Sequence, residues 1–509
     1  MTPGARVAAA IDILAACDGG GRPADDIAAD YFRRRRYIGA KDRVQIAAHV
    51  YGVLRHRAVI DWWIGRAAKG EVRPDARTRI IAALLLLPSP ASGGGSGTGW
   101  TAADLDTHFD GDRFRPAPLS PPELRLARGL AGRSLTHPEM PRAVACDIPD
   151  WLEPHLAAVY GRRLEDEMAA LNQPAPFDLR VNALRADRET ARRALAAEHI
   201  AAEPTPWSPL GLRLRQRAPL ASTAAFKDGL VEVQDEGSQL AALLADARPG
   251  MRVVDFCAGA GGKTLALAAQ MRNRGKLVAC DTAGWRLERA GIRLRRAGIS
   301  NVERRVLASE RDPWVKHHAK SFDRVFVDAP CLGIGSWRRN PDAKWRTAPR
   351  DLDELVVRQR DILASAARLV KPGGRLIYVT CSLLREENEA QAEAFLAAHP
   401  DFALCPAGQA WAEVLAKAGM GGPCPAGEDY LRLTPARHGT DGFFAALFDR
   451  ARDTAELHRT TEALGAGNPN FRAHLLGGPK VEDFSIKRDP DTGREIDYYS
   501  TLESIGHWS

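Results

Sequence analysis

The fold is decided by the stretch Asp328-Ala-Pro-Cys331-Leu-Gly-Ile-Gly-Ser-Trp-Arg-Arg-Asn-Pro-Asp342-Ala-Lys-Trp345. It follows Phe322-Asp-Arg-Val-Phe-Val327, a short apolar run that is typical of a buried parallel strand. A carboxylate, a thiol and two glycines therefore come together at a strand end, which is where ligands bind in open α/β sheets. A second predicted strand, Gly374–Thr380, is followed by another thiol, Cys381. We expect the two cysteines to lie on neighbouring strand ends.

Strands and helices alternate on both sides of this stretch. We predict strands over residues 251–255, 276–281, 322–327 and 375–380, and helices over residues 264–271, 285–296 and 351–370. Asp351 is the expected N-cap of the last helix, because its carboxylate can accept hydrogen bonds from free N–H groups of the first turn. Such alternation predicts an α/β domain with a doubly wound, Rossmann-like parallel sheet.

The regions outside this sheet differ from it in pattern. Residues 1–140 are rich in Ala and carry apolar residues at helical spacing, which predicts an all-α domain. Residues 141–236 begin with a helix and continue with short strand-like runs, which predicts a linker helix and a small α+β module. The sheet domain then occupies residues 237–450. Residues 451–509 are polar and lack a core pattern, so we expect a poorly structured C-terminal tail.

Length and charge limit the possible functions. A chain of 509 residues is too long for a single core. Its net charge of +7 favours an anionic partner, nucleic acid first, although a solvated Arg-rich surface would give the same value. The run Arg33–Arg36 fits a phosphate-binding site and an exposed helix face equally well.

Two further features concern location and metal binding. No apolar run reaches the roughly 18 residues of a membrane span, and the N-terminus lacks a signal-peptide pattern. We therefore expect a cytoplasmic protein without membrane contact. The eight cysteines are scattered without a Cys-x-x-Cys pair, which argues against a zinc ribbon or a disulfide scaffold, and no metal site is expected.

A glycine-rich turn follows the first predicted strand, in the order Asp255-Phe-Cys257-Ala-Gly-Ala-Gly-Gly-Lys263-Thr264. A P-loop would need Gly at position 257, and a dinucleotide fingerprint would need Gly at position 264. The remaining interpretation is a nucleoside-type cofactor without a pyrophosphate, such as S-adenosylmethionine. Asp281, at the end of the next strand, is well placed to accept hydrogen bonds from ribose hydroxyls. An ordinary turn without a ligand would show the same residues.

Two thiols and a carboxylate suggest covalent chemistry on a pyrimidine. C5 of a pyrimidine is too weak a nucleophile to attack a methyl sulfonium directly, but a thiolate that adds to C6 makes C5 reactive. Cys381, Cys331 and Asp328 are the candidates for this chemistry. Either cysteine alone would more simply be a small buried residue at a strand end. Their joint occurrence in polar, Gly-rich motifs favours the catalytic interpretation.

These motifs resemble those of a known enzyme family. Asp328-Ala-Pro-Cys331 with the following Arg-Arg-x-Pro-Asp342, together with Tyr378-Val-Thr-Cys381-Ser382, is similar to the Sun/RsmB-type (Nop/NSUN-type) RNA cytosine-C5 methyltransferases, which have a class I methyltransferase sheet. The likeness covers roughly residues 177–450. The N-terminal third more weakly resembles the NusB-like helical RNA-binding domain of bacterial members, and the module before the sheet is expected to be RRM-like.

The resemblance implies an S-adenosylmethionine-dependent enzyme that methylates cytosine C5 in RNA, first of all small-subunit ribosomal RNA, without an obligate protein partner. It implies that Cys381 attacks C6, that Cys331 assists release and that Asp328 contacts the base. It also implies cofactor binding by Cys257, Ala258, Gly259, Ala260, Gly261, Gly262, Lys263, Asp281 and Asp328, and RNA binding by Arg338, Arg339 and Lys344. Two alternatives stay open: the same chemistry on transfer RNA or large-subunit ribosomal RNA, and a non-catalytic RNA-binding factor of ribosome assembly.

The chain departs from the family pattern at two points. Gly259 and Ala260 replace an Ala and a Pro of the usual cofactor loop. The acidic residue that contacts adenine in the family has no match at its expected position, near residues 308–309, where Glu310 and Asp312 are the nearest candidates.

Overall fold

The computed structural model describes residues 1–88, 99–216, 218–417, 424, 427 and 429–452. The chain divides into two compact units, one of residues 1–399 and 404–450, the other of residues 400–403 and 451–509. The predicted tail, 451–509, lies outside the described residues except for 451–452. No helix in the described part of the chain is long and apolar enough to span a membrane.

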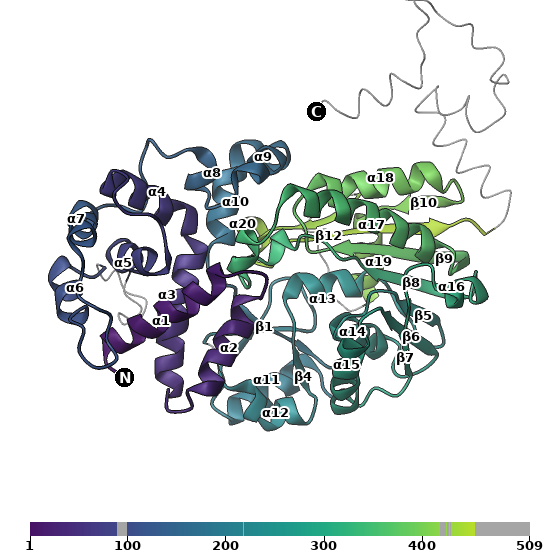
Figure 1. Ribbon diagram of the computed structural model, residues 1–509. Helices are drawn as coiled ribbons and strands as arrows, with labels where there is room; N and C mark the ends of the chain where they lie inside the picture. The colour runs from purple at the N-terminus through teal and green to yellow at the C-terminus, as the bar shows by residue number, and fades with distance from the viewer. Residues whose placement is uncertain (89–98, 217, 418–423, 425–426, 428, 453–509) are drawn as a thin grey trace, which may run out of the picture. The chain divides into compact units, whose positions relative to one another are not determined.

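The N-terminal residues of the first unit form a group of helices, purple to blue in Figure 1. Helix α5 is buried along nearly its whole surface except at Arg77, as expected for a central helix that is wholly apolar over residues 80–86. Its first turn is fixed by a capping box between Asp75 and Thr78. The helices are α1 (Pro3–Asp18), α2 (Ala24–Arg34), α3 (Ala40–Arg55), α4 (Arg57–Ala68), α5 (Ala76–Leu86), α6 (Ala102–His108), α7 (Pro121–Leu130) and α8 (Arg142–Ala145).

A linker of short helices leads to a small four-stranded antiparallel sheet in the order β2-β3-β1-β4. Helix α11 starts at a cap in which the Asp187 carboxylate accepts from the backbone N–H of Thr190 at 2.7 Å. The elements are η2 (Asp150–Leu152), α9 (Glu153–Tyr160), η3 (Gly161–Arg163), α10 (Leu164–Leu171), β1 (Phe177–Val181), α11 (Arg188–Ala197), β2 (Ala202–Pro204), β3 (Gly211–Leu214), η4 (Leu220–Ser222), α12 (Ala224–Lys227) and β4 (Val231–Val233).

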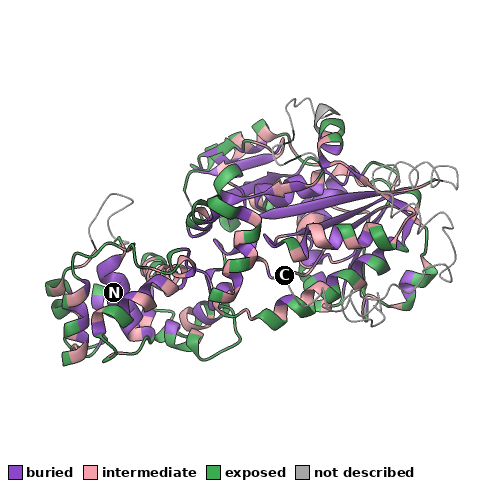
Figure 2. Cartoon of the chain, turned by 90° about the horizontal axis from the view of Figure 1, so that it is seen from above, coloured by how far each residue is buried: buried purple, intermediate pink, exposed green. Residues whose placement is uncertain are grey.

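The large sheet of the first unit runs in the order β12-β9-β8-β5-β6-β7, and β11 pairs with β12. Strands β5 to β9 are parallel, whereas β12 runs antiparallel to β9. The central strands are almost wholly buried, as the purple ribbons in Figure 2 show. This is the Rossmann-like sheet that the sequence predicts.

The elements of this domain alternate as expected. They are α13 (Glu236–Leu243), β5 (Arg252–Asp255), α14 (Gly262–Gln270), β6 (Lys276–Asp281), α15 (Gly284–Ala297), β7 (Val302–Val306), α16 (Pro313–His317), β8 (Phe322–Asp328), η5 (Ile334–Ser336), η6 (Pro341–Trp345), α17 (Pro349–Ala367), β9 (Val370–Thr380), η7 (Arg385–Glu387), α18 (Glu389–Ala398), β10 (Phe402–Cys405), α19 (Ala407–Lys417), β11 (Leu431–Leu433), α20 (Pro435–His438) and β12 (Phe443–Arg450).

One predicted cap is wrong. Helix α17 begins at Pro349 with Ala348 as its N-cap, so that Asp351 occupies the third helical position. From there its carboxylate reaches back and accepts from the Ala348 N–H at 2.7 Å. Asp351 thus satisfies a donor at the helix start from inside the helix, as the third residue of a capping box does.

A separate apolar cluster fixes the loops that follow β8 and β9. Leu152 and Leu156 of the linker helices pack with Leu332, Ile334 and Trp337 of the loop after β8. Each of these side chains is buried, and each full burial stabilises the fold by about 1.5–3 kcal/mol. The linker helices therefore hold the loop that carries Cys331.

Candidate active site

The structure brings the two predicted thiols together. Cys331 lies three residues after β8, and Cys381 directly follows β9, the parallel neighbour of β8. Their sulfur atoms are 3.5 Å apart, within hydrogen-bonding distance for sulfur. Both side chains are only partly buried, so the pair is not sealed into the core. Two residues fifty positions apart thus form one thiol pair at the carboxyl end of the sheet.

The surroundings of Cys331 affect the pKa of its thiol. The hydrogen bond with Cys381, first, and burial, second, raise the pKa of the Cys331 thiol. A thiol with a raised pKa keeps its proton at neutral pH and donates it to a neighbouring acceptor. Either sulfur can be the donor in the contact between them, and the protonated Cys331 thiol has a proton to give.

A buried carboxylate holds the Cys331 loop in place. Glu387 Oε1 accepts from the backbone N–H of Leu332 at 2.9 Å and from Gln359 Nε2 at 3.0 Å. The same Gln359 amide donates to the Pro330 carbonyl at 2.9 Å, and Tyr378 donates its hydroxyl proton to the Glu387 carbonyl at 2.6 Å. Glu387 could not be assigned a role from the sequence, because nothing local distinguishes it from the charged neighbours Arg385, Glu386 and Glu389.

Hydrogen bonds from two glycines and an asparagine fix the segment that carries Cys381. The Gly335 N–H donates to the Cys381 carbonyl at 2.8 Å, and Gly442 N–H donates to the Gly335 carbonyl at 2.9 Å. Any Cβ at Gly335 would collide with the backbone of Gly442, so this close approach requires glycine. Asn388 Nδ2 donates to the carbonyl of Ser382 at 3.1 Å, which ties the following residues to the same position.

A carboxylate and an ammonium lie beside the thiols. Asp328 ends β8, and its Oδ2 accepts from Lys263 Nζ at 2.6 Å. Burial lowers the pKa of Lys263, but Asp328 and Cys381 together raise it by more, so the ammonium form is favoured. The Lys263 ammonium thus lies within electrostatic range of Cys381.

The glycine-rich turn between β5 and α14 leaves part of its backbone uncovered. Gly259 and Gly261 have positive φ values of 54° and 81°, and a Cβ at Gly259 would meet no atom within 4 Å. The turn therefore offers an open backbone face next to the start of α14. Asp281 ends the adjacent strand β6 and accepts from Gly259 N–H and Ala283 N–H, each at 2.8 Å. This places all of Cys257–Lys263 and Asp281 at one edge of the sheet.

Asp255 is a buried acid in this region that the sequence reasoning did not single out. Burial raises its pKa to about 7, and its Oδ2 accepts from Thr264 Oγ1 at 2.6 Å. The signal was present in the sequence, because the three neighbouring strands β5, β8 and β6 end in Asp255, Asp328 and Asp281.

Arg338, for which the resemblance implies a contact with RNA, is buried in ion pairs within the fold. Its side chain is 4% exposed and makes ion pairs with Asp441 and, at 3.3 Å, with Asp235. Arg339 pairs with the same two carboxylates at 2.5 and 2.8 Å but stays partly exposed, so its contact with RNA remains a prediction. Two arginines here neutralise two buried aspartates. The pairing could not be predicted from the sequence, because the partners are about a hundred residues apart.

Lys344, for which the resemblance implies a contact with RNA, is also buried. Its side chain is 1% exposed, and its ammonium donates to Asn172 Oδ1 and, at 3.2 Å, to the carbonyl of Asp147. Next to it, Trp345 Nε1 donates to the Leu54 carbonyl of α3 at 2.7 Å. The stretch Arg338–Trp345 therefore docks onto the N-terminal and linker helices.

The two acidic candidates for an adenine contact have different positions. Asp312 caps α16, because its carboxylate oxygens accept from Ala308 N–H and Trp314 N–H at 2.9 Å each. These bonds lower the pKa of Asp312. Glu310 lies 3.6 Å from Arg311, and its backbone carbonyl accepts from Ser365. Only Glu310 has a carboxylate without a capping role.

Comparison with known proteins gives consistent matches. Residues 242–449 match the model of the 16S rRNA methyltransferase RsmB/F family, and residues 148–221 match the ferredoxin-like domain of RsmF/B-like methyltransferases. A probable ribosomal RNA small subunit methyltransferase B of Synechocystis is 30% identical over 84% of this chain and 95% of that protein.

Solved structures agree with these matches. The crystal structure of PH0851 has a TM-score of 0.69 and 27% identity, over 88% of this chain and 99% of that one. NSun6 from Pyrococcus horikoshii, solved with the S-adenosylmethionine analogue SFG, has a TM-score of 0.51 and 19% identity over 60% and 99%, a likeness of fold alone. By sequence over 84% of its length and by fold, the chain belongs to the RsmB/F family of 16S rRNA methyltransferases.

Proposed function

We propose that this chain transfers the methyl group of S-adenosylmethionine to C5 of a cytosine in small-subunit ribosomal RNA. The observation that carries the proposal is the pair of thiols 3.5 Å apart beside the Lys263–Asp328 ion pair. Family membership supports the RNA substrate and the small subunit. A ribosomal RNA substrate also makes the cytoplasm the proposed location.

The reaction begins with the Cys381 thiolate, which adds to C6 of the target cytosine. The new S–C6 bond saturates the C5–C6 double bond and moves electron density to C5, which then accepts the methyl group. The proton on C5 is lost to a base, and the S–C6 bond breaks as the thiolate leaves. The Lys263 ammonium stabilises the thiolate before attack and again on release.

Cys331 assists the release step. Because its thiol keeps its proton, it can donate a hydrogen bond to the departing Cys381 sulfur, 3.5 Å away. A thiolate that is hydrogen-bonded as it forms is a better leaving group. Removal of Cys331 should therefore slow release more than attack.

Asp328 supports cytosine over uracil as the target. Its carboxylate is an acceptor, and cytosine carries an amino group at C4, whereas uracil carries a carbonyl oxygen there. The base must leave its stack to reach the thiols, so a loop or single-stranded segment of the RNA is the expected substrate.

The cofactor would be held by residues of the glycine-rich turn. The open backbone face at Gly259 and the Asp281 carboxylate fit the hydroxyl groups of a ribose. When bound, S-adenosylmethionine supplies an electrophilic methyl group. Cys257, Ala258, Ala260, Gly261 and Gly262 complete the proposed binding turn, with Lys263 and Asp328 at its inner end.

The test is methyl transfer to defined RNA. The purified protein is incubated with methyl-labelled S-adenosylmethionine and ribosomal RNA from cells that lack it, and the digested RNA is analysed for 5-methylcytidine. We expect label in small-subunit RNA and none with Cys381→Ala. Label only in transfer or large-subunit RNA would show that one of these RNAs is the substrate. Binding of RNA without any label would favour an assembly factor.

A further inference from the structure

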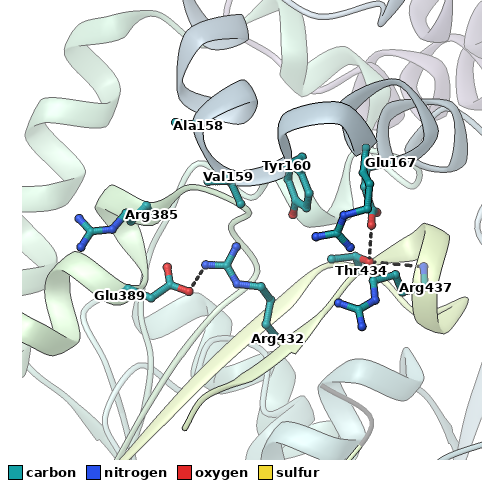
Figure 3. A pocket seen from close by; sticks show the side chains of 10 residues that line it. Ala158, Val159, Tyr160, Glu167, Arg385, Glu389, Arg432, Thr434 and Arg437 are labelled. Carbon is teal, nitrogen blue, oxygen red and sulfur yellow. Dashed lines mark hydrogen bonds and ion pairs between the residues drawn. The ribbon is translucent and has the colours of Figure 1, made fainter. Parts of the chain in front are cut away.

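A second cavity lies away from the glycine-rich turn, where the linker helices meet the end of the large sheet. Its volume is about 350 Å³, within the range of ligand sites. Its walls come from α9, η3 and α10 on one side and from η7, α18, β11 and α20 on the other. Figure 3 shows Tyr160 and Glu167 projecting from the helices toward Arg432 and Arg437. We call this site the arginine pocket and define it by Tyr160, Arg163, Arg432 and Arg437.

The charges of this pocket are unbalanced. Four arginines line it against two glutamates. Arg385 is held by Glu393 at 2.8 Å, and Arg432 makes an ion pair with Glu389. Two guanidinium groups of the lining remain without an ion pair to any residue that the structure describes. The second glutamate accepts hydrogen bonds from other residues of the fold.

That second glutamate is Glu167, which accepts from Thr434 Oγ1 at 2.9 Å and from Ala436 N–H at 3.4 Å. Arg163 and Arg437, both exposed, have no side-chain hydrogen bond or ion pair to any residue that the structure describes. Two guanidinium groups at one cavity therefore lack an anion.

A buried hydroxyl also faces this pocket. Tyr160 is 5% exposed, and its hydroxyl lies near Arg432 without the geometry of a hydrogen bond to any described residue. Burial lowers the pKa of Arg432 and raises that of Tyr160, so both groups are partly stripped of water. A buried donor without a partner costs stability unless a ligand satisfies it.

The pocket is joined to the thiol pair by a short rigid segment. Arg385 lies four residues after Cys381, so the two Cα atoms are at most about 14 Å apart. Between them, the Ser382 carbonyl accepts from Asn388, and two residues after Arg385 the Glu387 carboxylate binds the backbone of Leu332 in the Cys331 loop. An RNA strand whose base reaches Cys381 would need only a few nucleotides to reach the pocket.

We propose that the arginine pocket binds a backbone phosphate of the RNA strand that carries the target base. The guanidinium fork matches a phosphate in shape and charge, and the Tyr160 hydroxyl supplies a further donor. This inference rests on the proposed RNA substrate. It adds a binding site on the linker helices, whose α9–α10 segment would then touch both the substrate and the catalytic loops.

The test uses two matched double variants. Arg163→Gln/Arg437→Gln removes the two free charges of the pocket, and Arg162→Gln/Arg295→Gln removes two exposed charges outside it. The affinity for protein-free small-subunit ribosomal RNA is measured at several salt concentrations without S-adenosylmethionine. The slope of log K against log salt should fall by about 0.7 for each lost phosphate contact in the pocket variant and stay at the wild-type value in the control. Arg163→Lys/Arg437→Lys should recover most of the slope.

Equal slopes for the two double variants, with melting temperatures like that of the wild type, would overturn the proposal. So would calorimetric binding of inorganic phosphate or a nucleoside monophosphate that depends on Arg163 and Arg437 while the RNA slope does not change, because the pocket would then serve a small molecule. The assay needs no methyl transfer. A wild type that methylates RNA but shows no pocket effect contradicts the pocket alone, whereas a wild type that does not bind RNA contradicts the proposed function too.

Discussion

Replacing Lys344 with methionine tests whether this lysine is a structural residue or an RNA contact. The ammonium is buried against Asn172 and the carbonyls of Asp147 and Arg55, and burial lowers its pKa from the ordinary 10.5 to about 8. Between these two values the unfolded chain keeps a proton that the folded chain has released. The folded state therefore gains stability as the pH rises, and the cost of burying the charge is complete below about pH 8.

The size of the effect follows from the two pKa values. Between pH 7 and pH 10 the free energy of unfolding of the wild type should rise by about 2–3 kcal/mol relative to that of Lys344→Met. The assay is urea unfolding of both proteins at pH 7, 8, 9 and 10, analysed as the difference between them. Lys41→Met removes an exposed lysine, and its difference from the wild type should stay flat.

A difference for Lys344→Met that is also flat would refute the reasoning, because it would mean that the ammonium is solvated. In that case Lys344 could face RNA after all, and the salt dependence of RNA binding would change with the substitution. The buried position predicts no change in that slope.

Two further predictions concern the loops that hold the thiols. Gly335→Ala should abolish methyl transfer and destabilise the fold, since its Cβ would collide with the Gly442 carbonyl; Gly65→Ala, in an open helix position, should stabilise by about 0.5–1 kcal/mol in thermal unfolding. A Gly335→Ala enzyme with wild-type kcat would contradict this packing. Glu387→Ala leaves the Leu332 N–H unpaired, so it should lower the free energy of unfolding by about 1–3 kcal/mol and remove most of kcat. Glu387→Gln keeps the acceptor and should recover both. A similar loss in the two variants would reject the positioning role.

The parallel core of the fold could be predicted from sequence because its strands are buried on both faces. Residues 325–327 and 376–379 are short, fully buried apolar runs, and the ends of their strands identify the ligand edge. Strand β7, Val302–Val306, was missed because it is an edge strand with largely exposed charged residues. Strand β12 was missed because its identity depends on antiparallel pairing with β9, more than sixty residues away.

The site could be predicted only where a residue's neighbours are set by the sheet. Cys331 and Cys381 follow adjacent strands, so their approach follows from the topology. The environments of Arg338 and Lys344 could not be predicted, because Asp441 and Asn172 come from segments whose docking leaves no local pattern. From sequence alone, a basic residue in such a motif is predicted to contact a ligand, because the helices that cover it are not known.

The most direct test of the covalent mechanism is a denaturing gel of the Cys331→Ala variant incubated with small-subunit ribosomal RNA and S-adenosylmethionine. If Cys381 bonds to C6 and Cys331 speeds its departure, a stable RNA–protein adduct accumulates in Cys331→Ala and is absent from Cys331→Ala/Cys381→Ala. A folded, RNA-binding Cys331→Ala protein that forms no adduct, or an adduct that survives the loss of Cys381, would contradict the mechanism.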